Sequence, residues 1–114
     1  MKKITPNFSQ EEFMCRCGCG LMAINPALVQ RLQVIHDIVS LPIEIWSGYR
    51  CKKHNTEVGG AKSSLHMLGN ASDIHIKKYN MEDLAILLIN WSGGFHFYKK
   101  ENFIHIDIGT KRRW

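Results

Sequence analysis

Two short segments in which isoleucine alternates with titratable residues constrain the fold of this chain most. They are Asp73-Ile74-His75-Ile76 and Ile104-His105-Ile106-Asp107-Ile108. Because alternate side chains of a strand point to opposite faces, each segment predicts a half-buried strand with its isoleucines on the core side. The histidines and aspartates then share the other face of the sheet.

The second segment is expected to form one arm of an antiparallel hairpin, with residues 95–98 as the other arm and the polar stretch 99–102 as the turn. If Tyr98 faces Phe103, the register places His96 opposite His105. One histidine on a strand is usually a surface residue. Here, however, the polar face collects a whole set of titratable groups, and His66 lies on the loop leading into the first strand, so the sequence predicts a metal site. The set on the sheet is Asp73, His75, His96, His105 and Asp107.

Capping signals and apolar spacing predict three helices: a short one from Gln10, one over 26–40 and one over 81–91. A further short strand is expected over 43–46. Residues 51–65 are polar and glycine-bearing, which indicates a long ordered loop that delivers residues to a site. We therefore expect an α+β fold with two main helices, a small mostly antiparallel sheet and long ordered loops.

Length and charge limit the possible organisation and partners. With 114 residues, the chain is expected to be a single domain over 1–114 and a monomer. Its net charge of +5 favours an anionic partner such as a bacterial cell wall. The basic residues are scattered, so nucleic-acid binding is not expected, and the short cluster Lys111-Arg112-Arg113 is interpreted as a solvated tail. No apolar run follows the basic N-terminus, so we expect no signal peptide, no membrane insertion and synthesis in the cytoplasm.

The four cysteines are Cys15, Cys17, Cys19 and Cys51. Their even number permits two disulfides. A structural zinc site is also possible, but the single-residue spacing is tighter than the roughly two to four residues usual in such sites, so disulfides or free thiols are favoured. A cross-link to Cys51 would brace the neighbouring Arg50. The redox state stays open.

Two motifs carry a family resemblance: Ser64-x-His66-x-x-Gly69-x-Ala71-x-Asp73 and His105-x-Asp107. They resemble the zinc D-alanyl-D-alanine carboxypeptidases and endolysin-type peptidases of the M15 group, especially its short A-type branch. The resemblance covers nearly the whole chain and implies the fold shared by D-Ala-D-Ala peptidases and the hedgehog signalling domain. Its further segments are Phe8-Ser9-x-x-Glu12-Phe13, Ser47-Gly48-Tyr49-Arg50, His54-Asn55, Gly59-Gly60-Ala61 and Gly93-Gly94.

By this resemblance, His66, Asp73 and His105 hold one catalytic Zn²⁺ and leave it an open position. The implied function is a zinc metallopeptidase that cleaves peptidoglycan stem peptides through a zinc-bound hydroxide. It would act as a D-Ala-D-Ala carboxypeptidase or an endolysin-type endopeptidase, at the cell wall or in the periplasm. The alternative is a non-catalytic module of the same fold, stabilised by zinc, that binds the cell wall or forms part of a virion.

Arg50 is expected to bind a substrate carboxylate with two parallel hydrogen bonds and to take part in catalysis, as an arginine in this segment does in the resembling enzymes. The alternative is a structural ion pair with Glu44 or Glu57. Ser64 is expected at the substrate-binding site, where it either holds the loop or bonds to Asp73.

The general base is not evident from the sequence. Many members of the family have an acid three residues before the last histidine ligand, and this chain has Asn102 there. We expect His96 or Asp107 to act instead, with Glu101 as a third candidate, although Asp107 could equally orient an imidazole.

Overall fold

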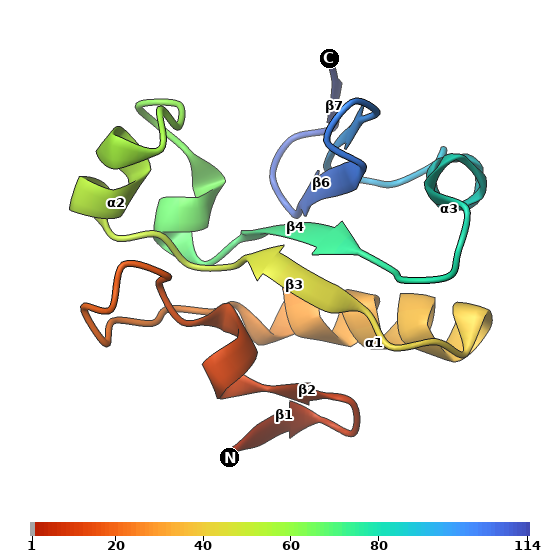
Figure 1. Cartoon of the computed structure of the whole chain (residues 1–114), viewed down its shortest axis with the longest axis horizontal. Helices are drawn as coiled ribbons and strands as arrows, with labels where there is room; N and C mark the ends of the chain where they lie inside the picture. The colour runs from red at the N-terminus through yellow and green to blue at the C-terminus, as the bar shows by residue number, and fades with distance from the viewer. Residues whose placement is uncertain (1) are drawn as a thin grey trace.

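The computed structural model describes residues 2–114, and a five-stranded sheet forms its centre (Figure 1). The strand order is β3-β4-β6-β5-β7. Neighbouring strands are antiparallel except for β7, which is parallel to β5. The bounds are β3 Glu44–Ser47, β4 Ala71–His75, β5 Gly94–Tyr98, β6 Phe103–Asp107 and β7 Arg112–Arg113. The α+β class and the mostly antiparallel sheet predicted from the sequence are confirmed.

Helix α1 (Pro26–Val39) packs on the apolar face of this sheet and crosses below β3 in the view of Figure 1. It begins as predicted, since the Asn25 side chain accepts a hydrogen bond from Ala27 N–H and Pro26 occupies the first turn. It ends at Ser40, whose φ of 56° is left-handed. Its buried side chains meet the strand isoleucines in one core: Leu28, Val29, Leu32 and Ile35 with Ile74, Ile76, Ile104 and Ile106.

The strand register places the titratable residues as the alternation predicted. Asp73 pairs with His105 across β4 and β6, and His96 pairs with His105 across β5 and β6. Ile74 and Ile104 are completely buried on the opposite face. The sheet therefore separates an apolar layer under α1 from a face that carries ionisable groups.

Three segments differ from the sequence-based expectation. The expected loop 51–65 contains a short helix, α2 (Lys52–Glu57), which has Asn55 as its buried residue and so lacks an apolar periodicity. Helix α3 (Met81–Leu87) ends before the expected Trp91, because the chain turns to bring the Trp91 indole N–H within 2.7 Å of the Asp107 carbonyl oxygen. The N-terminal segment forms an unexpected hairpin of β1 (Lys3–Thr5) and β2 (Phe8–Ser9).

The helix expected from Gln10 is present as a single 3₁₀ turn, η1 (Gln10–Phe13). Its predicted capping box forms, and Glu12 accepts a hydrogen bond of 2.7 Å from Ser9 N–H. Phe13 is completely buried and anchors this turn on the core.

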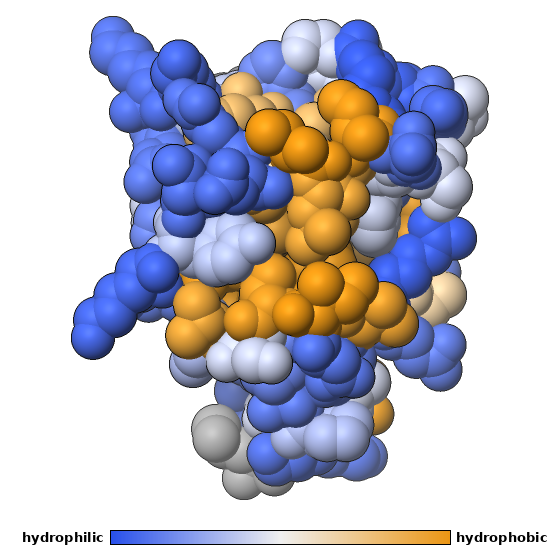
Figure 2. Space-filling model, turned by 90° about the vertical axis from the view of Figure 1, so that its right-hand side faces the viewer, coloured by the Kyte–Doolittle hydropathy of each residue, from blue (hydrophilic) through white to orange (hydrophobic). Residues whose placement is uncertain are grey.

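Apolar side chains gather on the face formed by α1 and α3 (Figure 2). They include Val34, Ile38, Ile86 and Ile89, which are exposed by 57–69%. None of the helices within residues 2–114 has the length and apolar character needed to cross a membrane.

Candidate metal centre and active-site cleft

Three side chains from separate elements converge on the polar face of the sheet. They are His66 from the 3₁₀ helix η2 (Leu65–Leu68), Asp73 from β4 and His105 from β6. Asp73 Oδ1 lies 3.3 Å from His66 Nε2 and 3.1 Å from His105 Nδ1. All three residues are at least nine-tenths buried. The structure thus brings together the three side chains that the family resemblance selects as metal ligands, and their ligand atoms lie within 4.8 Å of one another.

Hydrogen bonds on the far side of each ring fix which imidazole nitrogen faces this point. His66 Nδ1–H donates to the carbonyl oxygen of Gly48 over 2.7 Å, so its Nε2 carries the lone pair. That buried Nε2 has no hydrogen-bond partner among the described residues. His105 Nε2–H donates to Asp107 Oδ2 over 2.8 Å, which leaves its Nδ1 facing Asp73. Such outer hydrogen bonds are typical of metal-binding histidines.

The distances fit a small tetrahedral cation. Bonds of about 2.0–2.1 Å to zinc separate neighbouring ligand atoms by about 3.3–3.4 Å, close to the 3.1 and 3.3 Å measured from Asp73 Oδ1. The lone pair of His105 Nδ1 and the carboxylate of Asp73 repel each other unless a cation lies between them. The residues therefore fit a metal centre with two nitrogen ligands and one oxygen ligand.

The electrostatics of the group agree with this. Burial alone would raise the pKa of Asp73, but the adjacent His105 and His66 side chains hold it well below its usual range. Burial opposes the charge on His105, but the Asp107 and Asp73 carboxylates together raise its pKa. Without a metal, these two carboxylates favour the protonated form of His105.

Arg50 fixes the second oxygen of Asp73. Its Nη2 lies 3.2 Å from Asp73 Oδ2, its Nε donates to Ser47 Oγ over 3.1 Å, and its Nη1 donates to Asn55 Oδ1 over 3.1 Å. Within residues 2–114 this guanidinium is ion-paired with Asp73, and not with Glu44 or Glu57 as the sequence-based alternative supposed. Arg50 therefore orients the carboxylate while also lining the cleft.

Asp107 is completely buried and accepts four hydrogen bonds. Oδ1 accepts from the backbone N–H of Gly94 at 2.8 Å and of Gly109 at 3.0 Å. Oδ2 accepts from His105 at 2.8 Å and from Arg112 at 2.9 Å. A β-carbon on Gly94 would lie 2.2 Å from Asp107 Oδ2, which explains the glycine there. Of the two roles considered for Asp107, this geometry favours orienting the imidazole over general-base catalysis.

The C-terminal residues, which we interpreted as a solvated tail, form one wall of the site. The ring of Trp114 stacks on that of His96 with a centroid separation of 5.3 Å and meets that of His105 edge-on at 5.2 Å. Arg112 lies over Trp114 at 4.5 Å. The tail interpretation is wrong because β7 pairs with β5 and Arg112 pairs with the buried Asp107. No sequence pattern around Arg112 or Trp114 predicts that these residues line the site.

Burial, together with the charge of His105, lowers the pKa of His96. His96 is therefore a neutral imidazole near neutral pH and can accept a proton. It lies directly across the hairpin from His105.

A cleft of about 710 Å³ opens above the three converging residues. Its walls come from residues 58–65, from the hairpin residues Tyr98 and Phe103, and from the C-terminal segment 109–114. Ser64 lines the cleft, and its Oγ accepts a hydrogen bond of 3.2 Å from His66 N–H. It therefore holds the 3₁₀ turn that carries His66.

His75, from the polar face, and Asn102, from the hairpin turn, have other roles. His75 donates through Nδ1 to the carbonyl oxygen of Asn102 over 2.7 Å and stacks on Trp46. Asn102, where the family resemblance led us to expect an acid, has a φ of +65° in the hairpin turn. Asparagine adopts this left-handed conformation more readily than most residues.

Comparison with known proteins gives two findings. The model of the Peptidase M15 family matches residues 6–107. The chain is 31% identical over 102 residues to the peptidoglycan L,D-endopeptidase MepK of Escherichia coli K12, which covers 82% of this chain and 56% of that protein. It is 32% identical over 106 residues to the probable peptidoglycan L,D-endopeptidase MepK of Haemophilus influenzae, covering 80% and 54% respectively. The chain thus spans about half the length of these relatives.

Proposed function

The chain belongs to the Peptidase M15 family, and we propose that it is a zinc-dependent endopeptidase that hydrolyses peptidoglycan stem peptides. One observation carries the proposal: His66, Asp73 and His105 direct their lone pairs to one point at the base of an open cleft. The names of the relatives supply the substrate class, and on that basis we place the site of action at the bacterial cell wall.

In this proposal His66 Nε2, Asp73 Oδ1 and His105 Nδ1 hold one catalytic Zn²⁺. When bound, zinc would activate a water molecule and polarise the scissile carbonyl group. Asp107 keeps His105 in the tautomer that presents Nδ1, and Arg50 keeps Asp73 turned toward the centre. His96 would accept the proton of the attacking water, because its lowered pKa favours a neutral imidazole and it pairs with His105 across the hairpin.

The charge around the cleft suits an acidic peptide. Arg50 and Arg112 both line it. Three of the five N–H groups of Arg50 are used inside the protein, which leaves two for a substrate carboxylate or carbonyl oxygen. An arginine fixed in this way is better suited to positioning a chain that runs through the open cleft than to enclosing a free C-terminus.

The function is tested by incubating the zinc-loaded protein with purified muropeptides and identifying the products by mass spectrometry. We expect cleavage inside the stem peptide that stops when a chelator is added. Release of a single terminal D-alanine would instead identify a carboxypeptidase. No cleavage of any muropeptide by fully metallated protein, combined with retention on isolated cell walls, would favour the non-catalytic wall-binding alternative.

Replacing Arg50 by lysine is expected to lower kcat/KM by about ten- to a hundredfold even when the variant is fully loaded with zinc. Lysine retains the charge but cannot contact Ser47, Asn55 and Asp73 together. The measurement is steady-state hydrolysis with parallel metal analysis. Arg31→Lys is the matched control, since Arg31 donates to Ser92 on the surface. Wild-type turnover in Arg50→Lys would contradict the assigned role.

Replacing His96 by alanine is expected to lower kcat by about 10²- to 10⁴-fold with little change in zinc content. The effect follows from the loss of the proton acceptor, so the acidic limb of the pH–rate profile should also disappear. Full-rate hydrolysis with an unchanged profile would assign the proton transfer to another group.

A further inference from the structure

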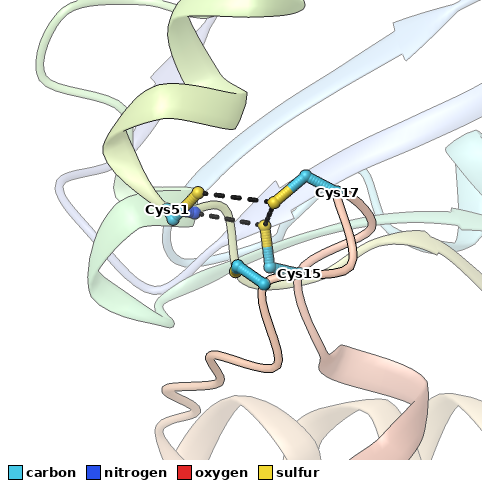
Figure 3. Close-up of side chains that lie close together, drawn as sticks. Cys15, Cys17 and Cys51 are labelled. Carbon is cyan, nitrogen blue, oxygen red and sulfur yellow. Dashed lines mark hydrogen bonds between the residues drawn. The ribbon is translucent and has the colours of Figure 1, made fainter.

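The side chains of the four cysteines converge at a second place, apart from the cleft. Figure 3 shows Cys15, Cys17 and Cys51 pointing toward one another. Cys17 Sγ lies 3.5 Å from Cys15 Sγ and 3.7 Å from Cys51 Sγ. Cys19 completes the group, whose four sulfur atoms lie within 4.8 Å of one another. All four are free thiols in the structure, which is one of the two states that the sequence favoured.

The backbone explains how cysteines spaced by one residue can meet. In an extended chain, alternate residues are about 6.5–7 Å apart and share one face. Here Gly18 and Gly20 have φ of +85° and +78°, and the Cys15 N–H donates to the Leu21 carbonyl over 3.0 Å, so the chain folds back on itself. A β-carbon on either glycine would have open space around it. Glycine is therefore needed at these two positions because of the left-handed backbone, and not because a side chain would lack space.

The sulfur geometry matches tetrahedral zinc. Bonds of about 2.3 Å to zinc separate neighbouring sulfur atoms by about 3.8 Å, whereas a disulfide requires about 2.05 Å. Three backbone N–H groups point at the sulfurs at 3.4 Å: Cys51 N–H at Cys15, His54 N–H at Cys51 and Leu21 N–H at Cys19. Such donors stabilise thiolate ligands.

Apolar packing contributes little to holding this loop. Cys15 is its buried residue, whereas Met14 and Leu21 at its ends are exposed by 36% and 53%. The loop nevertheless contacts Cys51, which directly follows Arg50 and lies between β3 and α2. A cross-link through the sulfurs explains its fixed position better than burial does.

We propose that Cys15, Cys17, Cys19 and Cys51 bind a second zinc ion in a closed structural site. Four protein ligands leave no open position, so this ion takes no part in hydrolysis. It fastens the η1 segment to the chain that carries Gly48 and Arg50, next to the backbone bond from Tyr49 N–H to the Phe13 carbonyl of 2.9 Å. The proposal concerns different ligands from the cleft and holds whether or not the protein is a peptidase.

The test is metal analysis of protein purified under reducing conditions. Wild type is expected to hold about two zinc ions per chain. The double variant Cys17→Ser/Cys19→Ser should lose one ion, and its folding is expected to survive because both side chains are exposed. His66→Ala is the matched control, since it should lose the other ion and keep the one bound by sulfur.

Cobalt substitution gives a readout that needs no cysteine variant. Wild type and His66→Ala loaded with Co²⁺ should both show the intense near-ultraviolet charge-transfer band of thiolate ligands, and the double cysteine variant should lose it. Absence of this band in wild type would overturn the proposal. Two other results would overturn it as well. One is an intact mass that is lower by two hydrogen atoms per disulfide, although the protein was kept under reducing conditions. The other is a coloured protein that holds iron bound by thiolates.

Discussion

Replacing His66 by alanine is expected to remove the catalytic metal and with it hydrolysis. The change leaves Asp73 and His105 as the only ligands of the proposed centre, and its loss of zinc affinity should exceed the roughly 10- to 100-fold that follows from mutating an outer hydrogen-bond partner. The Gly48 carbonyl also loses the hydrogen bond that it accepts from His66. Metal analysis and muropeptide hydrolysis on the same preparation measure both effects.

His75→Ala is the matched control for this experiment. His75 belongs to the polar face predicted from the sequence, but it stacks on Trp46 and bonds to the Asn102 carbonyl oxygen away from the cleft. We expect its zinc content and hydrolysis to stay near those of the wild type. A His66→Ala protein that retained catalytic zinc and turnover would refute the metal centre, whereas equal losses in both variants would indicate a general effect on folding.

The parts of the fold that the sequence predicted correctly have short-range signals. Alternation in 73–76 and 104–108 predicted the strands and their faces, and the aromatic pair Tyr98 and Phe103 predicted the hairpin register. The Asn25-Pro26 pair predicted the start of α1. Each signal depends on neighbours a few residues apart, which is why it can be read without a structure.

The elements that sequence analysis missed depend on long-range contacts. β7 is held by β5 and by the ion pair of Arg112 with the buried Asp107, and no local pattern in a basic segment reports such a partner. Trp114 reaches the site for the same reason. The convergence of the four sulfur atoms could not be predicted either, because it depends on the left-handed turns at Gly18 and Gly20 and not on the spacing of the cysteines.

For the candidate site, the family resemblance selected a set of residues that the structure brings together. What it could not supply is the orientation of each group. The Gly48 carbonyl decides which nitrogen of His66 faces the centre, and Asp107 does so for His105. His66 and Gly48 are 18 positions apart in the sequence, and His105 and Asp107 are two positions apart. In both cases the path of the backbone at the site must be known before the hydrogen bond can be predicted.

Replacing Asp107 by alanine is expected to lower the free energy of unfolding by about 3–5 kcal/mol, the cost of removing one partner from a buried ionic pair. The backbone N–H groups of Gly94 and Gly109 would lose their acceptor, and Arg112 and His105 would lose theirs. Since the free energy of unfolding of a native domain is about 5–15 kcal/mol in total, the loss is a large fraction of the stability. Denaturant unfolding of wild type and variant measures it.

Asp37→Ala is the matched control, because that carboxylate is exposed and bonds to Gln33 on the surface of α1. Its effect should stay within about 0.5 kcal/mol. Asp107→Asn keeps the shape and one acceptor oxygen, so it should lose less stability than alanine but reduce zinc affinity by about 10- to 100-fold through the tautomer of His105. An Asp107→Asn protein with normal zinc affinity would show that His105 keeps its ligand nitrogen without this carboxylate.

The pH dependence gives a second check on Asp107. Burial would raise the pKa of Asp107, but hydrogen bonds from His105, Gly94 and Gly109 lower it in the folded protein. Its stabilisation is therefore complete above the unfolded pKa of about 3.9 and declines as the pH falls below that value. The stability difference between wild type and Asp107→Asn should accordingly shrink as the pH falls below about 3.9. A difference that grew as the pH fell would mean that the carboxylate is not ionised in the folded protein, and the orientation of His105 would then need another cause.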